Sequence, residues 1–246
     1  MKLSQGLAAV GLSFAAIAAH AEVTGTVTAI TDYNFRGISL SANDPALQGS
    51  IDWAQESGFY AGAWASNIDY GDETDGDLEV DLYLGFAGAF NDDLGYDVGL
   101  VYYTYPSSDD IKDYPEIYAG LTYKWLELKQ WYTNDYSGSD NDAYYTEANA
   151  SFELPADFSL SLHVGYNYGE GYDAAPAEEG DVQLKDSQYM DYSIGVGYTL
   201  GHFDLGLSYV GTDLDKGDYL FSDEDVFKSE DRVIFSIATT FPWSNE

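Results

Sequence analysis

Residues Leu78–Phe90, with the sequence LEVDLYLGFAGAF, decide the fold class of this chain. Apolar side chains recur at every second position, which is the period of a β-strand, whereas a helix would distribute them around its circumference. One face of the segment carries Glu79 and Asp81, and the other carries Leu78, Val80, Leu82, Leu84, Phe86 and Phe90. The segment is therefore predicted to be a strand with one polar and one apolar face.

The same period recurs along the chain and predicts twelve strands. Ten are clear: Val23–Arg36, Ala46–Ala54, Leu78–Phe90, Tyr96–Thr104, Glu116–Trp125, Tyr144–Leu154, Phe158–Tyr168, Tyr189–Leu200, Phe203–Val210 and Arg232–Phe241. Phe59–Ile68 and Leu128–Asp135 count as strands by position and composition, and the phase of both is left open. Short connections alternate with long acidic ones, a rhythm typical of a transmembrane β-barrel with short periplasmic turns and long outer loops.

The positions of aromatic residues distinguish a membrane barrel from a soluble β-sandwich, whose strands would also alternate. Near the short connections lie Trp53, Phe90, Tyr96, Trp125, Phe152, Phe158, Tyr198, Phe203 and Phe241. Near the long ones lie Tyr33, Phe35, Tyr102, Tyr144, Tyr166, Tyr168, Tyr192 and Tyr209. Two aromatic belts around an aliphatic band match the two interfaces of a bilayer, so the pattern favours the membrane barrel.

Composition excludes several other classes of protein. The 246 residues include 43 Asp or Glu and 9 Lys or Arg, and the formal charge of −34 argues against nucleic-acid partners, which need clustered basic residues. The lack of cysteine excludes disulfides and thiolate metal sites. An aromatic content of 16% argues against disorder. A run of about 18 apolar residues, which a membrane-spanning helix needs, does not occur in the sequence.

Energetics predict which face of each strand meets lipid. A charged side chain on the lipid face costs up to ~2–4 kcal/mol at mid-depth, so Glu79 and Asp81 are expected to point inward. An open sheet edge in lipid would leave backbone groups unpaired, so the last strand is expected to pair with the first. The predicted fold is an all-β, closed, antiparallel transmembrane barrel of about twelve strands. Such a barrel has a backbone diameter of ~24 Å and leaves a passage of about 12 Å at most.

The first 21 residues are predicted to be a secretory signal peptide. Lys2 precedes a short apolar stretch, Gly6–Ala19, and a small-x-small cleavage pattern follows it. Cleavage is expected between Ala21 and Glu22, after export through the Sec pathway. Residues 22–246 then form a single barrel domain, which is expected in the outer membrane of a Gram-negative bacterium.

Several stretches resemble the TorF family of porins. The likeness rests on TDYNFRGIS (Thr31–Ser39), PALQG (Pro45–Gly49), ESGFYAG (Glu56–Gly62), ASN (Ala65–Asn67), YYTYP (Tyr102–Pro106) and EIYAG (Glu116–Gly120), all within about the first 120 residues. The resemblance implies an outer-membrane channel whose substrate is not defined. One departure is that Phe241 ends the last strand but is followed by Pro242–Glu246, whereas outer-membrane barrels usually finish on an aromatic residue.

Charged residues on the polar faces are the candidate lining of the pore. They are Asp32, Arg36, Asp52, Glu79, Asp81, Asp97, Glu116, Lys124, Glu147, His163, Asp191 and Arg232. Acids outnumber bases, and a low-dielectric wall with excess negative charge concentrates cations, so a cation preference is predicted. The alternative for any one acid is that it keeps the interior wet and pairs with a base. Arg36 either steers solutes across the pore or forms an interior salt bridge.

Three functions remain open at this point: a passive channel for small polar solutes, a non-conducting structural or adhesive barrel, and a hydrolase in the barrel wall. The hydrolase would use His163 with Ser159 or Ser161, but Ser161 and His163 are ~6–7 Å apart along one strand. No complete set of nucleophile, base and orienting residue can be assembled, so no enzyme activity and no cofactor are expected.

The expected partners follow from the predicted location of the barrel. They are outer-membrane lipid and lipopolysaccharide, small polar solutes, and, during biogenesis, periplasmic chaperones and the barrel assembly machinery. The acidic loop clusters Asp72–Asp77 and Asp213–Asp218 could bind divalent cations, although neither fits the spacing of a calcium-binding loop. Such runs are more often simply solvated.

Overall fold

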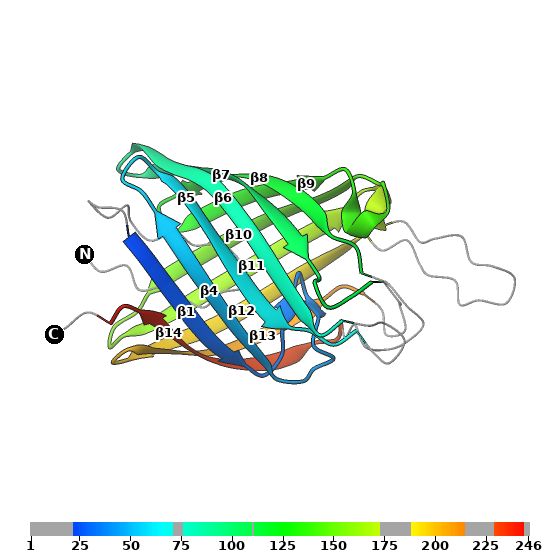
Figure 1. The fold of residues 1–246 in the computed structure, drawn as a ribbon. Coiled ribbons are helices and arrows are strands. Elements are labelled where there is room, and N and C mark those ends of the chain that lie inside the picture. The colour runs from blue at the N-terminus through cyan, green and yellow to red at the C-terminus, as the bar shows by residue number, and fades with distance from the viewer. Residues whose placement is uncertain (1–21, 71–75, 110, 173–187, 215–228, 244–246) are drawn as a thin grey trace, which may run out of the picture.

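The computed structural model describes residues 22–70, 76–109, 111–172, 188–214 and 229–243, which form a closed antiparallel β-barrel (Figure 1). Its twelve wall strands are β1 (Glu22–Ile30), β4 (Ala46–Ala54), β5 (Phe59–Asn67), β6 (Leu78–Asn91), β7 (Leu94–Thr104), β8 (Tyr114–Tyr123), β9 (Leu126–Thr133), β10 (Ala143–Glu153), β11 (Phe158–Tyr168), β12 (Tyr189–Leu200), β13 (Phe203–Thr212) and β14 (Arg232–Phe241). The predicted fold class is confirmed.

Closure comes from β1, which pairs on one side with β4 and on the other with β14. Gly25 lies opposite Phe241 in the β1–β14 pair and opposite Ile51 in the β1–β4 pair. Every wall strand thus has two hydrogen-bonded neighbours, and the sheet has no free edge. Within the described ranges, no helix is long and apolar enough to cross a membrane.

The strands point apolar side chains outward and polar ones inward, as their sequence period predicts. In β6, Leu82 is 50% exposed on the outer surface, whereas the neighbouring Asp81 is only 3% exposed. Leu162 of β11 is likewise exposed on the outside, while Asn167 of the same strand is buried. The exterior of the barrel is therefore apolar and its interior carries the ionisable groups.

The structure settles the phase of the two strands that the sequence left open. In β5, Tyr60 and Ser66 are buried inside the barrel and Phe59 lies on the outside. In β9, Lys129 is 2% exposed and lies inside, whereas Leu128 is 52% exposed and lies outside. Both strands carry bulky aromatic side chains on their inward faces, which is why hydrophobicity alone did not reveal their phase.

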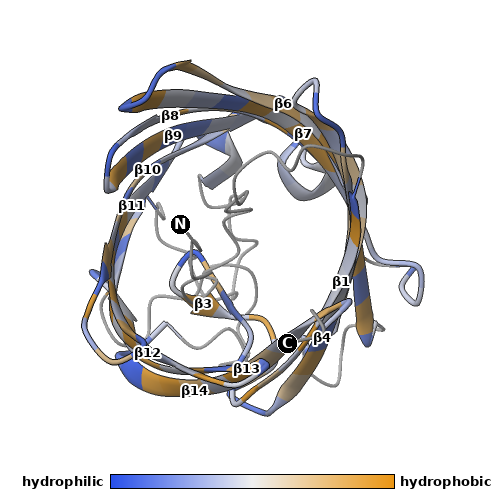
Figure 2. Cartoon of the chain, turned by 90° about the vertical axis from the view of Figure 1, so that its left-hand side faces the viewer, coloured by the Kyte–Doolittle hydropathy of each residue, from blue (hydrophilic) through white to orange (hydrophobic). Residues whose placement is uncertain are grey.

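The prediction that the first strand extends to Arg36 is wrong. β1 ends at Ile30, and the chain then forms a small hairpin from β2 (Asn34–Phe35) and β3 (Ile38–Ser39). Figure 2, a view along the barrel, shows β3 inside the ring of wall strands. The segment 31–45, from here on the inner hairpin, therefore folds into the barrel and does not prolong the wall.

Two aromatic residues consequently leave the predicted outer belt. Tyr33 is 1% exposed and packs against Trp64 with ring centroids 5.3 Å apart, and Phe35 packs against Tyr103 at 6.0 Å. The other belt pairs lie as expected, for example Phe158 and Tyr198 near the short turns.

Candidate functional site

The inner hairpin is fastened to the wall by Arg232, the first residue of β14. The guanidinium of Arg232 donates from Nε to the Asp32 carboxylate, from Nη2 to Asn34 Oδ1 at 2.8 Å and from Nη1 to the Gly37 carbonyl at 3.0 Å. The Arg232 and Asp32 side chains are 11% and 5% exposed. One cation therefore holds the base, the first arm and the turn of the hairpin.

Serine hydroxyls complete the base of the hairpin. Ser39 and Ser41 both donate to Asp32 Oδ1, the second over 3.3 Å, and Ser41 Oγ accepts from the Tyr33 amide at 2.9 Å. The Asn43 amide donates to Ser39 Oγ at 2.9 Å. Because these buried serine, carboxylate and backbone groups satisfy one another, the base of the hairpin can leave the sheet with most of its polar atoms hydrogen-bonded.

The tip of the hairpin is the two-residue turn Arg36–Gly37. Both residues have positive φ, 48° and 85°, as a tight type I′ turn requires. Glycine adopts this conformation freely, whereas it is unfavourable for arginine. A Cβ at Gly37 would lie 2.5 Å from Thr212 Cγ2 and 2.7 Å from Asp191 Cβ, so the tip touches the wall at β12 and β13. The turn thus places Arg36 deep inside the barrel.

The Arg36 guanidinium makes a two-pronged ion pair with Glu116 of β8. Nη1 donates to Oε1 at 3.0 Å and Nη2 to Oε2 at 2.5 Å, and both side chains are almost fully buried. Glu116 also accepts a hydrogen bond from Tyr103, and Arg36 lies 3.4 Å from the hydroxyl of Tyr172. Burial raises the pKa of the Tyr172 hydroxyl, which therefore stays neutral beside the guanidinium.

Aromatic rings enclose the same guanidinium. Its central carbon lies 4.3 Å from the ring centroid of Tyr145, 4.8 Å from that of Phe35 and 5.7 Å from that of Trp131. Distances of this size give a favourable cation–π interaction, which is strongest when the cation is desolvated. Arg36 thus lies in an interior salt bridge, and its surroundings are aromatic as well as anionic.

A hydrogen-bonded network continues from there along β10, β11 and β12. His163 Nε2 lies 2.8 Å from Asp191 Oδ1, and its Nδ1 lies 2.6 Å from Asn149 Oδ1. The Tyr145 hydroxyl lies 3.0 Å from His163 Nε2, and Asn149 donates to Glu147 at 3.0 Å. Both ring nitrogens of His163 therefore face wall side chains, and neither bonds to Ser159 or Ser161, the serines of the hydrolase hypothesis.

A second group of charges lies around Lys129. Its Nζ is 3.3 Å from Glu127 and 3.6 Å from Asp97, and the ammonium lies 4.8 Å from the ring centroid of Tyr118. Tyr60 donates to Asp97 at 2.6 Å. This cluster neutralises one cation within the wall, as Glu116 does for Arg36.

Two acids of β6 lack such a partner. Glu79 and Asp81 are 1% and 3% exposed, and neither makes an ion pair with a described base. Within the part of the chain that the structure describes, Glu79 Oε2, Asp81 Oδ1 and the Tyr33 hydroxyl accept or donate no hydrogen bond.

Eleven of the twelve candidate lining residues lie on the inner side of the wall or in the inner hairpin, and Lys124 does not. Lys124 is in the turn between β8 and β9 with φ 57°, is half exposed and pairs with Asp93 at 3.6 Å. A side chain in a two-residue turn does not continue the alternation of its strand, so its placement in the pore lining is wrong. Among the described residues, the lysine that faces the interior is Lys129, which the open phase of β9 concealed.

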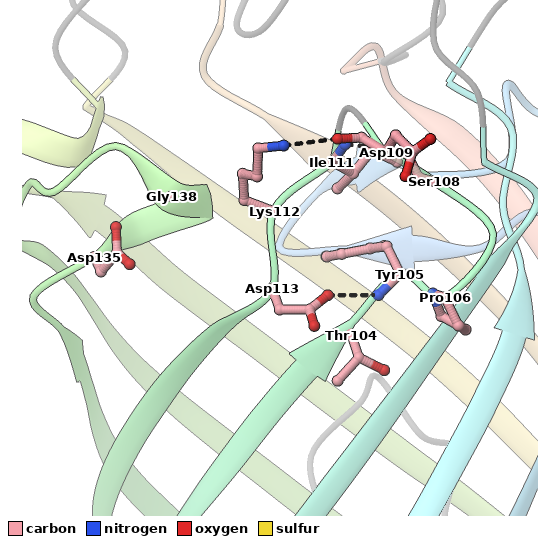
Figure 3. A pocket seen from close by; sticks show the side chains of 10 residues that line it. All are labelled: Thr104, Tyr105, Pro106, Ser108, Asp109, Ile111, Lys112, Asp113, Asp135 and Gly138. Atoms are coloured by element: carbon pink, nitrogen blue, oxygen red, sulfur yellow. Dashed lines mark hydrogen bonds between the residues drawn. The ribbon is translucent and has the colours of Figure 1, made fainter.

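A hollow lies between the long β7–β8 and β9–β10 connections, at the end of the barrel away from the short turns (Figure 3). It is lined by Thr104, Tyr105, Pro106, Ser108, Asp109, Ile111, Lys112, Asp113, Asp135 and Gly138. Lys112 Nζ donates to the Asp109 carbonyl at 2.6 Å, and Asp113 accepts from the Tyr105 amide at 2.9 Å. Polar and charged groups therefore line the rim.

Metal binding has no support among the residues that the structure describes, where no cluster of three or more His, Cys, Asp or Glu could hold an ion. The loop clusters proposed from sequence, Asp72–Asp77 and Asp213–Asp218, lie largely outside the described residues.

Two solved porin structures have a similar fold. The NanC porin aligns with a TM-score of 0.56 at 11% identity, over 90% of this chain and all of NanC. The KdgM porin, solved in complex with disordered oligogalacturonate, aligns with a TM-score of 0.54 at 7% identity, over 91% of this chain and all of KdgM. At these identities the likeness concerns the fold alone.

Comparison with curated protein sequences gives no match. The profile of a family described as "Bacterial protein of unknown function (Gcw_chp)" matches residues 15–241, almost the whole chain. The chain therefore belongs to the Gcw_chp family of bacterial proteins.

Proposed function

We propose that the protein is a porin-like channel of the bacterial outer membrane, through which small polar solutes diffuse passively. The observation that carries this proposal is the closed wall of twelve strands with an apolar exterior and a charged interior. Ionisable side chains are costly to bury, and a water-filled passage is the usual reason for a barrel to keep so many of them inside. The likeness of fold to NanC and KdgM supports it.

The channel is proposed to prefer cations. The bases Arg36, Lys129 and Arg232 each contact a carboxylate, so their charge is neutralised within the wall. Asp52, Glu147 and Asp191 also face the interior and make no ion pair with a Lys or Arg among the described residues, and a negative wall of low dielectric concentrates cations. Interior charge, not the formal charge of the chain, is the basis of this preference.

Planar-bilayer recording of the purified protein tests both statements. Discrete ohmic conductance steps are expected, with a reversal potential in a KCl gradient that shows potassium permeating better than chloride. A correctly folded barrel that gives no steps would favour the alternative of a structural or adhesive barrel. A chloride preference would contradict the cation proposal and leave the channel proposal standing.

The biological setting is part of the same proposal. The signal peptide Met1–Ala21, Sec export, assembly by periplasmic chaperones and the barrel assembly machinery, and contact with lipid and lipopolysaccharide all follow from an outer-membrane barrel. The stretch Thr31–Ser39, on which the likeness to the TorF porins largely rests, forms the core of the inner hairpin, and this supports a porin role. We propose no enzymatic activity, since His163 is engaged by Asn149 and Asp191.

A further inference from the structure

The side chain of Arg36 lies in a receptor that other parts of the chain have built. The receptor, here called the cation cage, consists of Glu116 (β8), Trp131 (β9), Tyr145 (β10) and Tyr172, which follows β11. Together they offer a planar cation a carboxylate with two acceptors, two aromatic faces and a hydroxyl. We propose that the cation cage is a binding site for solutes that carry a guanidinium group, and that Arg36 occupies it as a tethered substitute for such a solute.

The cation cage does not depend on Arg36 for its shape. Tyr103 donates to Glu116 Oε2 at 3.0 Å, and the Trp131 indole donates to Glu147 Oε1 at 2.7 Å. The Tyr145 hydroxyl donates to Asp191 at 3.2 Å, and the Tyr172 hydroxyl donates to Asn167 at 3.0 Å. Each of the four side chains therefore has a partner of its own in the wall, so the cage stays formed when the guanidinium leaves.

The geometry selects guanidinium over ammonium. Arg36 engages both oxygens of Glu116 through two separate nitrogens, at 3.0 and 2.5 Å, a match that the planar fork provides and a point-charge ammonium does not. The flat guanidinium also lies near the rings of Tyr145 and Trp131, an arrangement favourable to a delocalised cation. A free solute with the same group can make the same contacts.

Arg36 is a replaceable occupant. Its positive φ of 48° is unfavourable for a residue other than glycine, so the bound tip carries some backbone strain. Its advantage over a free solute is its tether, which supplies an effective concentration on the order of millimolar. A guanidinium solute at comparable concentration would compete with the Arg36 side chain for the cage and occupy part of the passage, while Arg232 keeps the hairpin in place. The flow through the pore would then be regulated by a solute that it carries.

The experiment measures binding of L-arginine amide by calorimetry to the folded protein in detergent, with L-lysine amide as the matched cation. Arg36→Gly removes the guanidinium and suits the positive φ of the turn, and Arg36→Asn, which also tolerates this conformation, is the second variant. Both are expected to bind arginine amide at least tenfold more tightly than the wild type does and to prefer it over lysine amide. Adding Glu116→Gln to either variant should abolish this binding, and Lys124→Ala, which removes an equal charge far from the cage, should behave like the wild type.

Equal affinity of wild type and both Arg36 variants, or equal binding of the two amides, would overturn the inference. The idea of a regulated passage rests on the proposed channel, so the same variants are also recorded in planar bilayers, where arginine amide should block Arg36→Gly at lower concentration than the wild type. Failure of every variant to conduct, with selective binding intact in calorimetry, would refute the channel and support the cage. Normal conductance without selective binding would do the reverse.

Discussion

Replacing residues 31–45 by Asn-Gly should open the barrel without unfolding it. Ile30 and Ala46, which flank the segment, are paired residues of β1 and β4, so a two-residue type I′ turn can join them directly. The variant keeps all twelve wall strands and removes only the inner hairpin. Glu116 and Arg232 lose their hairpin partners but gain access to water.

The expected size of the effect follows from the cross-section of the barrel. A passage of about 12 Å has an area of roughly 110 Å². Two strands ~4.8 Å apart, with side chains that make a layer ~10 Å thick, cover on the order of 100 Å² of it. The inner hairpin is therefore expected to dominate the resistance of the pore, and its removal should raise single-channel conductance by about threefold or more.

Gel mobility before and after heating first shows that the barrel is folded. Single-channel recording in KCl then measures the conductance of the variant and of the wild type. The matched control shortens a different connection, replacing Pro106–Lys112 at the outer rim by Asn-Gly, and should leave conductance nearly unchanged. A folded variant without residues 31–45 whose conductance equals that of the wild type would refute the reasoning, because the hairpin would then not limit the current.

Three substitutions test the remaining parts of the argument. Arg232→Ala leaves a buried carboxylate without its cation and should lower the free energy of unfolding by about 3 kcal/mol, measured by denaturant titration of tryptophan fluorescence. Gly37→Ala should cost about 2–4 kcal/mol, since its Cβ would lie 2.5 Å from Thr212 Cγ2 of β13, whereas Gly201→Ala, also at positive φ but in open space, should cost only about 1 kcal/mol. Asp52→Asn should reduce the potassium-to-chloride permeability ratio, since this inward carboxylate is only half-buried, and an unchanged ratio would contradict the role given to it.

The number of strands, the closure of the barrel and the inward or outward direction of the side chains were predictable. All three rest on the alternation of polar and apolar residues, which recurs in each strand. Alternation such as that of Leu78–Phe90 does not depend on the loops, because contact with lipid on one face of the strand requires apolar residues there. The phase of β5 and β9 was not predictable, because Tyr60 and Trp131 point inward although their rings are apolar enough to suit the outside. When aromatic residues line the interior, the two faces of a strand differ less in hydrophobicity, and it is this difference that shows which face points inward.

The inner hairpin escaped prediction for a different reason. Tyr33 and Phe35 alternate with Asp32 and Asn34, so the wall pattern continues by chance beyond the point where the strand ends. The pair Arg36–Gly37, which lies between the apolar residues Phe35 and Ile38, was the available sign of a turn in the sequence. A two-residue turn at this point needs an arginine at positive φ, which is rare. Which acid pairs with Arg36 depends on contacts between residues 80 positions apart, and no local pattern contains that information.

The ion pair of Asp32 with Arg232 joins positions 200 residues apart, one in the first connection and the other at the start of the last strand. The first connection therefore has its anchor only when the last strand, which carries Arg232, is in place. Narrowing of the passage is thus linked to completion of the ring.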